Sequence, residues 1–270
     1  MSSLVNSTNP FTASMQGQVW GARARDWVDV QEPAAQPLYE TALLALDLPA
    51  EASLLDAGCG GGLFCALAAN RGYKVTGVDA APRLIEIAQR RVPGRMFLQC
   101  DLEELPFGGS THFDAVLAFN SLQYTRAPLK ALGELHRVLK PGGRLVLTTW
   151  AEPAHCEGAA CLQALAALLP PQPANAPGAF AFAPPGIIAD LTARAGFTPV
   201  TELTSKIVWD YPDEATALRG LLSAGPAVRA VRHAGEPAAT AAVKQAIAPF
   251  KEADGHYRLR NVIRCVIVAK

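Results

Sequence analysis

The sequence lacks the patterns of a membrane-spanning helix, a secretion signal and a metal-binding site. No apolar run approaches the roughly 20 residues that a membrane-spanning helix needs, and residues 1–11 lack the basic start and apolar stretch of a secretion signal. The six cysteines form no CxxC pair and have no histidine at zinc-ligand spacing. We therefore predict a cytoplasmic protein with no membrane contact, no metal site and reduced, buried thiols.

An excess of charge of one sign is also missing, because 24 basic side chains balance 24 acidic ones in the 270 residues. Binding to a phosphate backbone needs a basic excess, so nucleic acid is not an expected partner. The balance is uneven along the chain, since residues 151–224 carry 3 basic and 7 acidic side chains while residues 225–270 carry 8 and 3. We expect these charges on solvated helix faces and a strand edge.

Half of the residues are hydrophobic, which suits one globular unit with a sizeable core. From residue 53 onward, short β-rich runs alternate with amphipathic helices, and this pattern predicts an α/β, Rossmann-like, doubly wound sheet. Residues 1–50 are predicted to form an N-terminal helical lid segment, and residues 51–150 the ligand-binding core. Residues 151–270 are predicted to hold the rest of the sheet and two further lid insertions, at about 151–185 and 210–256.

The sharpest local signal is the run Leu54-Leu55-Asp56-Ala57-Gly58-Cys59-Gly60-Gly61-Gly62, which precedes a helical stretch. A buried strand that runs into glycines indicates a tight turn that a ligand approaches closely. The dinucleotide fingerprint requires a glycine where Leu63 stands, and the Asp56 carboxylate would repel a pyrophosphate.

Two more acidic residues follow the next strands. Asp79 lies where a carboxylate accepts hydrogen bonds from ribose hydroxyls, and Asp101-Leu102 can contact an adenine. Three acids on three successive strand ends fit a ligand that has an ammonium group, a ribose and an adenine but no phosphate. S-adenosylmethionine is such a ligand.

The chain resembles the class I S-adenosylmethionine-dependent methyltransferases, and among them small-molecule enzymes of the methyltransferase-11 type. The resemblance covers about residues 17–150. It rests on five ordered motifs: DAGCGGG at 56–62, VTGVD at 75–79, CDLEELPF at 100–107, FDAV at 113–116 and RVLKPGG at 137–143.

The resemblance implies a seven-stranded sheet of order 3-2-1-4-5-7-6 with an antiparallel last strand, and S-adenosyl-L-methionine as methyl donor with S-adenosyl-L-homocysteine as product. It places Asp56, Gly58 and Gly60 around the methionine portion, Asp79 at the ribose, Asp101 and Leu102 at the adenine, and Asn120 and Ser121 beside the sulfonium. The cofactor contacts that it implies also include Trp20, Trp27, Cys59 and Ala80.

Methyl transfer from a sulfonium mainly requires alignment, because the leaving group is neutral. We predict a small organic acceptor held under the lid, with His155 as a candidate general base and Tyr124 as a candidate acceptor contact. Oxygen, nitrogen and carbon acceptors stay open. The alternatives are a nucleotide-dependent oxidoreductase and a non-catalytic protein that binds S-adenosylmethionine.

Overall fold

A computed structural model describes residues 12–109, 112–173 and 176–270, and its centre is a seven-stranded sheet. The strand order is β3-β2-β1-β4-β5-β7-β6, and β7 runs antiparallel to both of its neighbours. The predicted strand order is therefore confirmed. The strands are β1 (Ser53–Ala57), β2 (Lys74–Asp79), β3 (Met96–Gln99), β4 (Phe113–Phe119), β5 (Leu139–Trp150), β6 (Thr198–Tyr211) and β7 (Tyr257–Ala269).

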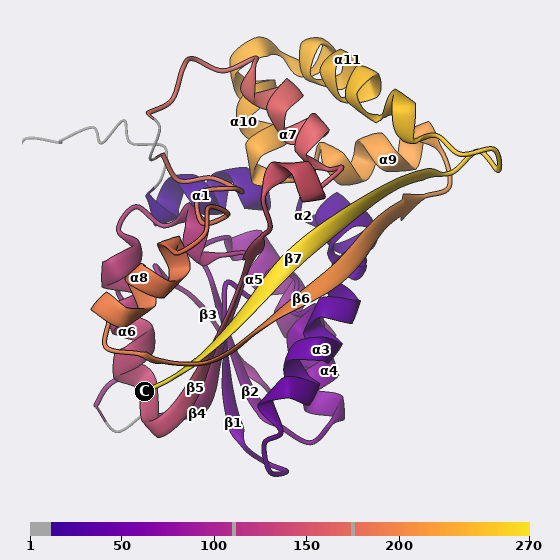
Figure 1. Cartoon of the computed structure of the whole chain (residues 1–270). Helices are drawn as coiled ribbons and strands as arrows, with labels where there is room; N and C mark the ends of the chain where they lie inside the picture. Colours follow the sequence, from indigo (N-terminus) through magenta and orange to yellow (C-terminus); the bar gives the residue numbers. More distant parts are fainter. Residues whose placement is uncertain (1–11, 110–111, 174–175) are drawn as a thin grey trace, which may run out of the picture.

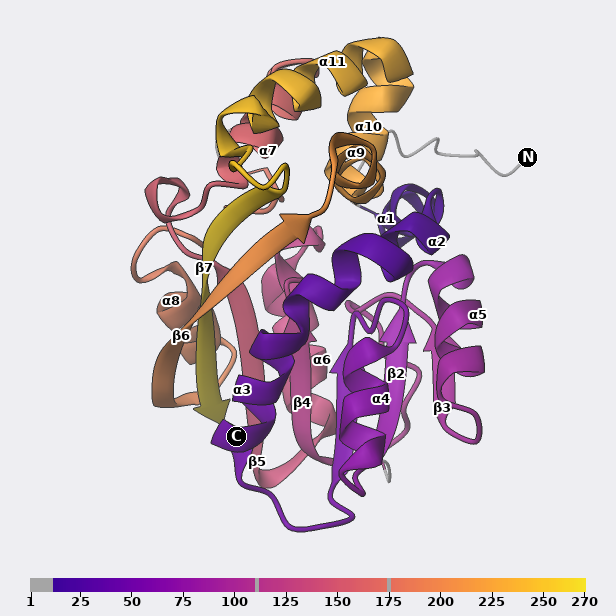
Figure 2. The same ribbon diagram turned by 90° about the vertical axis from the view of Figure 1, so that its right-hand side faces the viewer.

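Helices cover both faces of the sheet (Figures 1 and 2). One face packs against α3 (Gln36–Leu46), α4 (Leu63–Asn70) and α5 (Pro82–Arg91), and the other against α6 (Pro128–Val138) and α8 (Ile187–Arg194). Successive strand residues point to opposite faces, so Leu54 joins the first apolar cluster and Leu55 the second. Burial on both faces explains why the central strands are apolar almost throughout.

The N-terminal segment crosses the top of the sheet in several short pieces. They are α1 (Ala13–Gly21), α2 (Ala24–Asp26), the π-helical turn η1 (Trp27–Gln31) and the 3-10 turn η2 (Glu32–Ala35). The first of these pieces, α1, begins after the Thr12 cap and ends before Ala22. Gly17 brings α1 against the backbone of Ala80, since a Cβ at Gly17 would lie 2.2 Å from that carbonyl oxygen.

Four helices form a layer beyond the upper ends of β6 and β7, and we call these four helices the lid (Figures 1 and 2). They are α7 (Ala159–Ala166), α9 (Glu214–Leu221), α10 (Gly225–Ala234) and α11 (Glu236–Ile247). Three short 3-10 turns complete the described elements: η3 (Leu122–Tyr124), η4 (Pro153–His155) and η5 (Ala248–Phe250). The lid contacts the N-terminal segment through α1 and α10.

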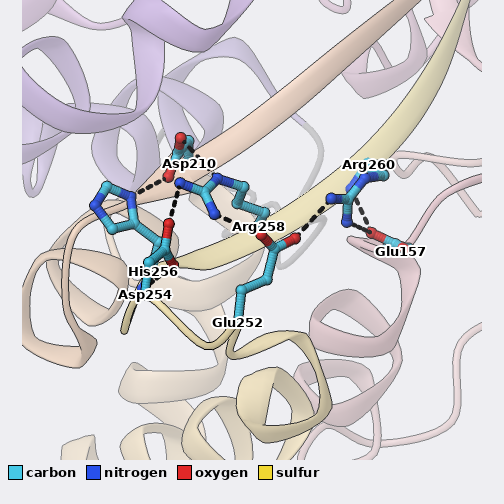
Figure 3. A network of polar contacts seen from close by, with 7 residues as sticks. All are labelled: Glu157, Asp210, Glu252, Asp254, His256, Arg258 and Arg260. Carbon is cyan, nitrogen blue, oxygen red and sulfur yellow. Dashed lines mark hydrogen bonds and ion pairs between the residues drawn. The ribbon is translucent and has the colours of Figure 1, made fainter.

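The uneven charge of the sequence is neutralised where the lid joins the sheet. Arg258 at the start of β7 pairs with Asp210 at the end of β6, and with Glu252 and Asp254 just before β7 (Figure 3). Arg260 continues the network to Glu252 and to Glu157, which precedes α7 (Figure 3). Two of these acidic partners, Asp210 and Glu157, belong to the acidic segment 151–224, and the other two belong to the basic stretch itself.

Two absences hold for residues 12–109, 112–173 and 176–270. No helix there has the length and apolar character to span a membrane. No group of three or more His, Cys, Asp or Glu side chains there could hold a metal ion.

Candidate active site

The loop after β1 needs its glycines for two separate reasons. Gly58, Gly60 and Gly62 have φ angles of 93°, 54° and 79°, a left-handed region that favours glycine. The loop is also crowded, because a Cβ at Gly58 would lie 2.3 Å from the Cβ of Ser121, and one at Gly61 would lie 2.3 Å from Val28 Cγ2. The loop is therefore held between the end of β4 and the N-terminal segment.

Asp79, the last residue of β2, fixes this loop. Its Oδ2 accepts a hydrogen bond from the Gly60 backbone N–H (2.9 Å), and its Oδ1 accepts one from the Ala81 N–H (2.8 Å). Burial raises the pKa of this carboxyl, although these backbone hydrogen bonds oppose the shift. An ionised carboxylate has about four acceptor sites, so Asp79 can accept two further hydrogen bonds from a ligand diol.

Asp101 and Leu102 follow β3 at the same edge of the sheet. The Oδ1 of Asp101 accepts a hydrogen bond from the Glu103 N–H (2.8 Å), and no residue in the described parts of the chain donates to its Oδ2. Leu102 is half-buried beside it. This pair offers one open acceptor and one apolar surface.

A cavity of about 220 Å³ lies between these strand ends, the N-terminal segment and the lid. It brings together most of the predicted contacts: Trp20, Trp27, Gly58, Gly60, Asp79, Ala80, Asp101, Leu102, Asn120, Ser121 and Tyr124. Asn120 is in the left-handed region (φ 48°), and no residue of the described chain donates a hydrogen bond to its buried Oδ1. The carboxylates, the glycine loop and this orphaned amide oxygen fit a ligand with ribose, amine and ammonium groups, as S-adenosylmethionine has.

Comparison with known proteins agrees with this geometry. A family model described as a methyltransferase domain matches residues 55–147. The ubiquinone biosynthesis O-methyltransferase of Alkalilimnicola ehrlichii is 32% identical over 139 residues, which make up 47% of this chain and 56% of that protein. The malonyl-[acyl-carrier protein] O-methyltransferase of Serratia marcescens is 36% identical over 98 residues, covering 36% of this chain and 38% of that protein. Residues 55–147 of this chain are thus a methyltransferase domain.

Solved structures with the fold of this methyltransferase domain match over most of the chain. The [4+2]-cyclase SpnF has a TM-score of 0.63 at 19% identity and covers 96% of both chains. The YcgJ protein of Bacillus subtilis has a TM-score of 0.56 at 19% identity and covers 86% of this chain and 97% of its own. These likenesses show the fold alone. The chain spans little more than half the length of the ubiquinone biosynthesis relatives that it matches.

Asp56 and Cys59, two of the predicted cofactor contacts, do not line the cavity of the methyltransferase domain. Asp56 is 1% exposed beneath the loop, where its Oδ2 accepts a hydrogen bond from Cys65 Sγ (3.4 Å) and its Oδ1 has no partner. Burial raises the pKa of Asp56 to about 8. Burial also raises the pKa of the Cys59 thiol, which points to the Gly77 side of the loop.

His155 lies outside the cavity as well. It is the last residue of η4, where its side chain is exposed, and its backbone N–H donates to the Glu152 carbonyl. Tyr124 does line the cavity, with its ring edge-on to Trp20 at 5.4 Å. Burial raises the pKa of the Tyr124 hydroxyl, so it keeps its proton at neutral pH. The side chain of His155 therefore does not line the cavity, and no contact supports the predicted role of His155 as a general base.

Glu32 and Arg91 are functional candidates that the sequence analysis missed. Glu32, 3% exposed in η2, accepts a hydrogen bond from the Gly61 N–H (2.7 Å) and forms an ion pair with Arg91. Arg91 also donates to the Gly61 carbonyl oxygen (2.8 Å). Burial raises the pKa of Glu32, while Arg91 and the loop amides oppose that shift. Because the two side chains are 59 positions apart, no spacing in the sequence pointed to them.

The sheet order separates the ends of β5 and β6 from Asp79 and Asp101 at the ends of β2 and β3, and the cavity wall on the β5–β6 side is mostly apolar. We call this part of the cavity the acceptor compartment. Its walls come from the ends of β4, β5 and β6, from α3, and from the lid helix α7. The rings of Trp150 and Trp209 meet edge-on at 5.4 Å. The residues that define the compartment are Tyr39, Phe119, Trp150, Leu162, Ile207 and Trp209.

Proposed function

We propose that this protein transfers a methyl group from S-adenosylmethionine to a small molecule. The observation that carries the proposal is one continuous cavity with two unlike ends. The carboxylates of Asp79 and Asp101 line one end, and the acceptor compartment forms the other. The names of the curated relatives, two kinds of O-methyltransferase, support oxygen as the methylated atom.

In this proposal, S-adenosylmethionine supplies an electrophilic methyl group on a sulfonium. Asp79 would bind the ribose hydroxyls, and the free Oδ2 of Asp101 would accept a hydrogen bond from the adenine amine. Asn120 Oδ1 and the backbone of the Gly58 loop would surround the methionine portion. The chain would then have to align the acceptor and exclude water. The lid and the aromatic rings of the acceptor compartment would do both.

The wall of the cavity offers no evident general base. No histidine lines it within the described ranges of the chain, and the hydroxyls of Tyr39 and Tyr124 have raised pKa values, so both stay protonated. Glu32 is already engaged with Gly61 and Arg91, and Glu103 with the Ala127 N–H and Arg126, while Asp79 and Asp101 lie at the cofactor end. Alignment is therefore the main catalytic contribution that we assign to the chain.

Calorimetry tests the cofactor half of the proposal. We expect S-adenosylhomocysteine to bind and NADH not to bind; binding of NADH alone would favour the oxidoreductase reading. Methyl-labelled S-adenosylmethionine, incubated with the protein and a deproteinised metabolite extract, tests the transfer. We expect label in a new organic-soluble product, whereas label that stays wholly in intact donor would overturn the proposed activity and favour a binding protein.

A further inference from the structure

The charges along the cavity differ between its two ends. The charged residues on its wall are Glu32, Asp79, Asp101 and Glu103, and no Lys, Arg or His of the described chain joins them. Asp79 and Asp101 lie at the cofactor end. Glu32 is paired with Arg91, and Glu103 accepts a hydrogen bond from the Ala127 N–H (2.9 Å) and pairs with Arg126 (3.7 Å).

None of the six residues that define the acceptor compartment is charged, and Glu32, a carboxyl near Tyr39, is already paired with Arg91. A carboxylate or phosphate on the acceptor would lose its hydration there without gaining a cation, and an unpaired buried charge is strongly disfavoured. Arg229 on α10 interacts with Tyr124, but it does not line the cavity. The walls favour an uncharged molecule.

Tyr39 carries the one hydroxyl group among the six residues that define the compartment. Its ring on α3 packs edge-on against Phe119 at 4.6 Å and Phe64 at 5.8 Å, which fixes the direction of the hydroxyl. That hydroxyl makes no hydrogen bond to any residue of the chain that the structure describes, and it lies on the cavity wall. Burial, together with the nearby carboxyls of Glu32 and Asp56, raises its pKa well above the usual value, so it acts as a donor.

We infer that the acceptor is an uncharged, largely apolar molecule and that the Tyr39 hydroxyl positions it by donating a hydrogen bond to one of its oxygen atoms. The inference rests on the proposed function, because it names the substrate class of that same site. It makes Tyr39 a specificity residue.

Binding of four small probes to the complex with S-adenosylhomocysteine tests this assignment. The probes share one butylbenzene frame: 4-butylphenol and 4-butylanisole carry an oxygen, butylbenzene carries none, and 4-butylbenzoate carries a negative charge. We expect the phenol and the anisole to bind about 3- to 10-fold more tightly than butylbenzene, the range of one net hydrogen bond. We expect the benzoate to bind at least about 10-fold more weakly than the phenol at pH 7.5.

Three variants assign the effects to residues. Tyr39→Phe should remove the advantage of 4-butylanisole over butylbenzene and leave the benzoate weak. Tyr73→Phe is the matched control, because the Tyr73 hydroxyl bonds to the Leu48 carbonyl and does not line the cavity. Leu162→Lys adds a cation to the compartment and should make the benzoate the tightest of the four probes.

Two results would overturn the inference: wild-type protein that binds the benzoate as tightly as the phenol, or Tyr39→Phe protein that keeps the preference for the anisole. Both can occur while S-adenosylhomocysteine binds normally, in which case the proposed methyl transfer stands. Failure to bind S-adenosylhomocysteine instead contradicts the proposed function itself.

Discussion

The cofactor side and the lid side of the molecule use charged groups in opposite ways. Around the glycine loop, Asp56 and Glu32 are almost fully buried, and their pKa values are raised. Where the lid joins β6 and β7, Arg258 pairs with carboxylates that are a third to a half exposed. Buried carboxyl groups shape a binding site but lower the stability of the fold. Exposed ion pairs hold two elements together and change that stability little.

The largest effect is expected at Asp79. Asp79→Ala removes both anchors of the glycine loop and the proposed ribose contacts, so S-adenosylhomocysteine affinity should fall about 100-fold or more. Calorimetric titration measures it, and the circular dichroism spectrum checks that the variant is folded. Asp190→Ala, an exposed acid on α8, is the control and should bind as the wild type does. A folded Asp79→Ala protein with unchanged affinity would contradict the assignment of this end of the cavity.

Removal of the buried ion pair should have the next largest effect. Glu32→Ala leaves Arg91 and the Gly61 N–H without their partner, so we expect a loss of about 2 to 3 kcal/mol in the free energy of unfolding. Glu32→Gln keeps an acceptor for Gly61 and should lose less. Urea denaturation measures both. Equal losses would show that the hydrogen bond to the loop contributes nothing.

Asp56 gives a pH-dependent test on the same side. Its pKa rises from 3.8 in the unfolded chain to about 8 in the folded one, so between these values only the unfolded state is ionised. The contribution of this carboxyl to the free energy of unfolding therefore falls as the pH rises toward 8. Wild-type protein should lose stability relative to Asp56→Asn between pH 5 and 8, as measured by thermal unfolding.

Asp114 at the start of β4 supplies the control for this test. Burial opposes the shift there, but hydrogen bonds from Lys140 and Ser53 hold the pKa of Asp114 at about 2. The contribution of ionised Asp114 to stability is lost only in acid. The unfolding temperatures of Asp114→Asn and wild type should therefore differ by a constant amount from pH 5 to 8. If the difference in unfolding temperature between wild type and Asp56→Asn is also constant from pH 5 to 8, Asp56 is ionised in the folded protein.

The smallest effect is expected on the lid side. Arg258→Gln removes the centre of an exposed network, and we expect a small drop in the unfolding midpoint that vanishes in 1 M salt. Differential scanning calorimetry at low and high salt measures it. A drop that salt leaves unchanged would indicate that Arg258 stabilises the junction by packing instead.

The sequence predicted the sheet because each strand and helix carries its own local pattern. The glycines after β1 and Asp79 at the end of β2 stand at fixed places in that pattern. It could not predict which way Asp56 points. Asp56 lies inside β1 and faces Cys65 on α4, whereas Asp79 ends β2 and faces the loop. Glu32 and Arg91 were missed because their contact exists only once two distant elements pack together.

The sequence predicted a small acceptor held under the lid, but it did not predict which residues form the wall of the acceptor compartment. Tyr39, Trp150 and Trp209 belong to three separate elements, and no local pattern marks them as neighbours. His155, the candidate general base of the sequence analysis, lies five residues after the end of β5. The chain turns away there into η4, and the side chain remains exposed.

The attachment of the lid has a consequence for how this protein could be modified. Tyr211 and Tyr257 are partners in the β6–β7 register, so the segment between them leaves the sheet and returns to it at one place. Closing a loop costs little more when the loop is longer, about 0.6 kcal/mol for each doubling of its length. Residues 212–256, which carry α9, α10 and α11, thus form one insertion between paired strand ends, and its length can vary at little cost while the register of β6 and β7 is kept.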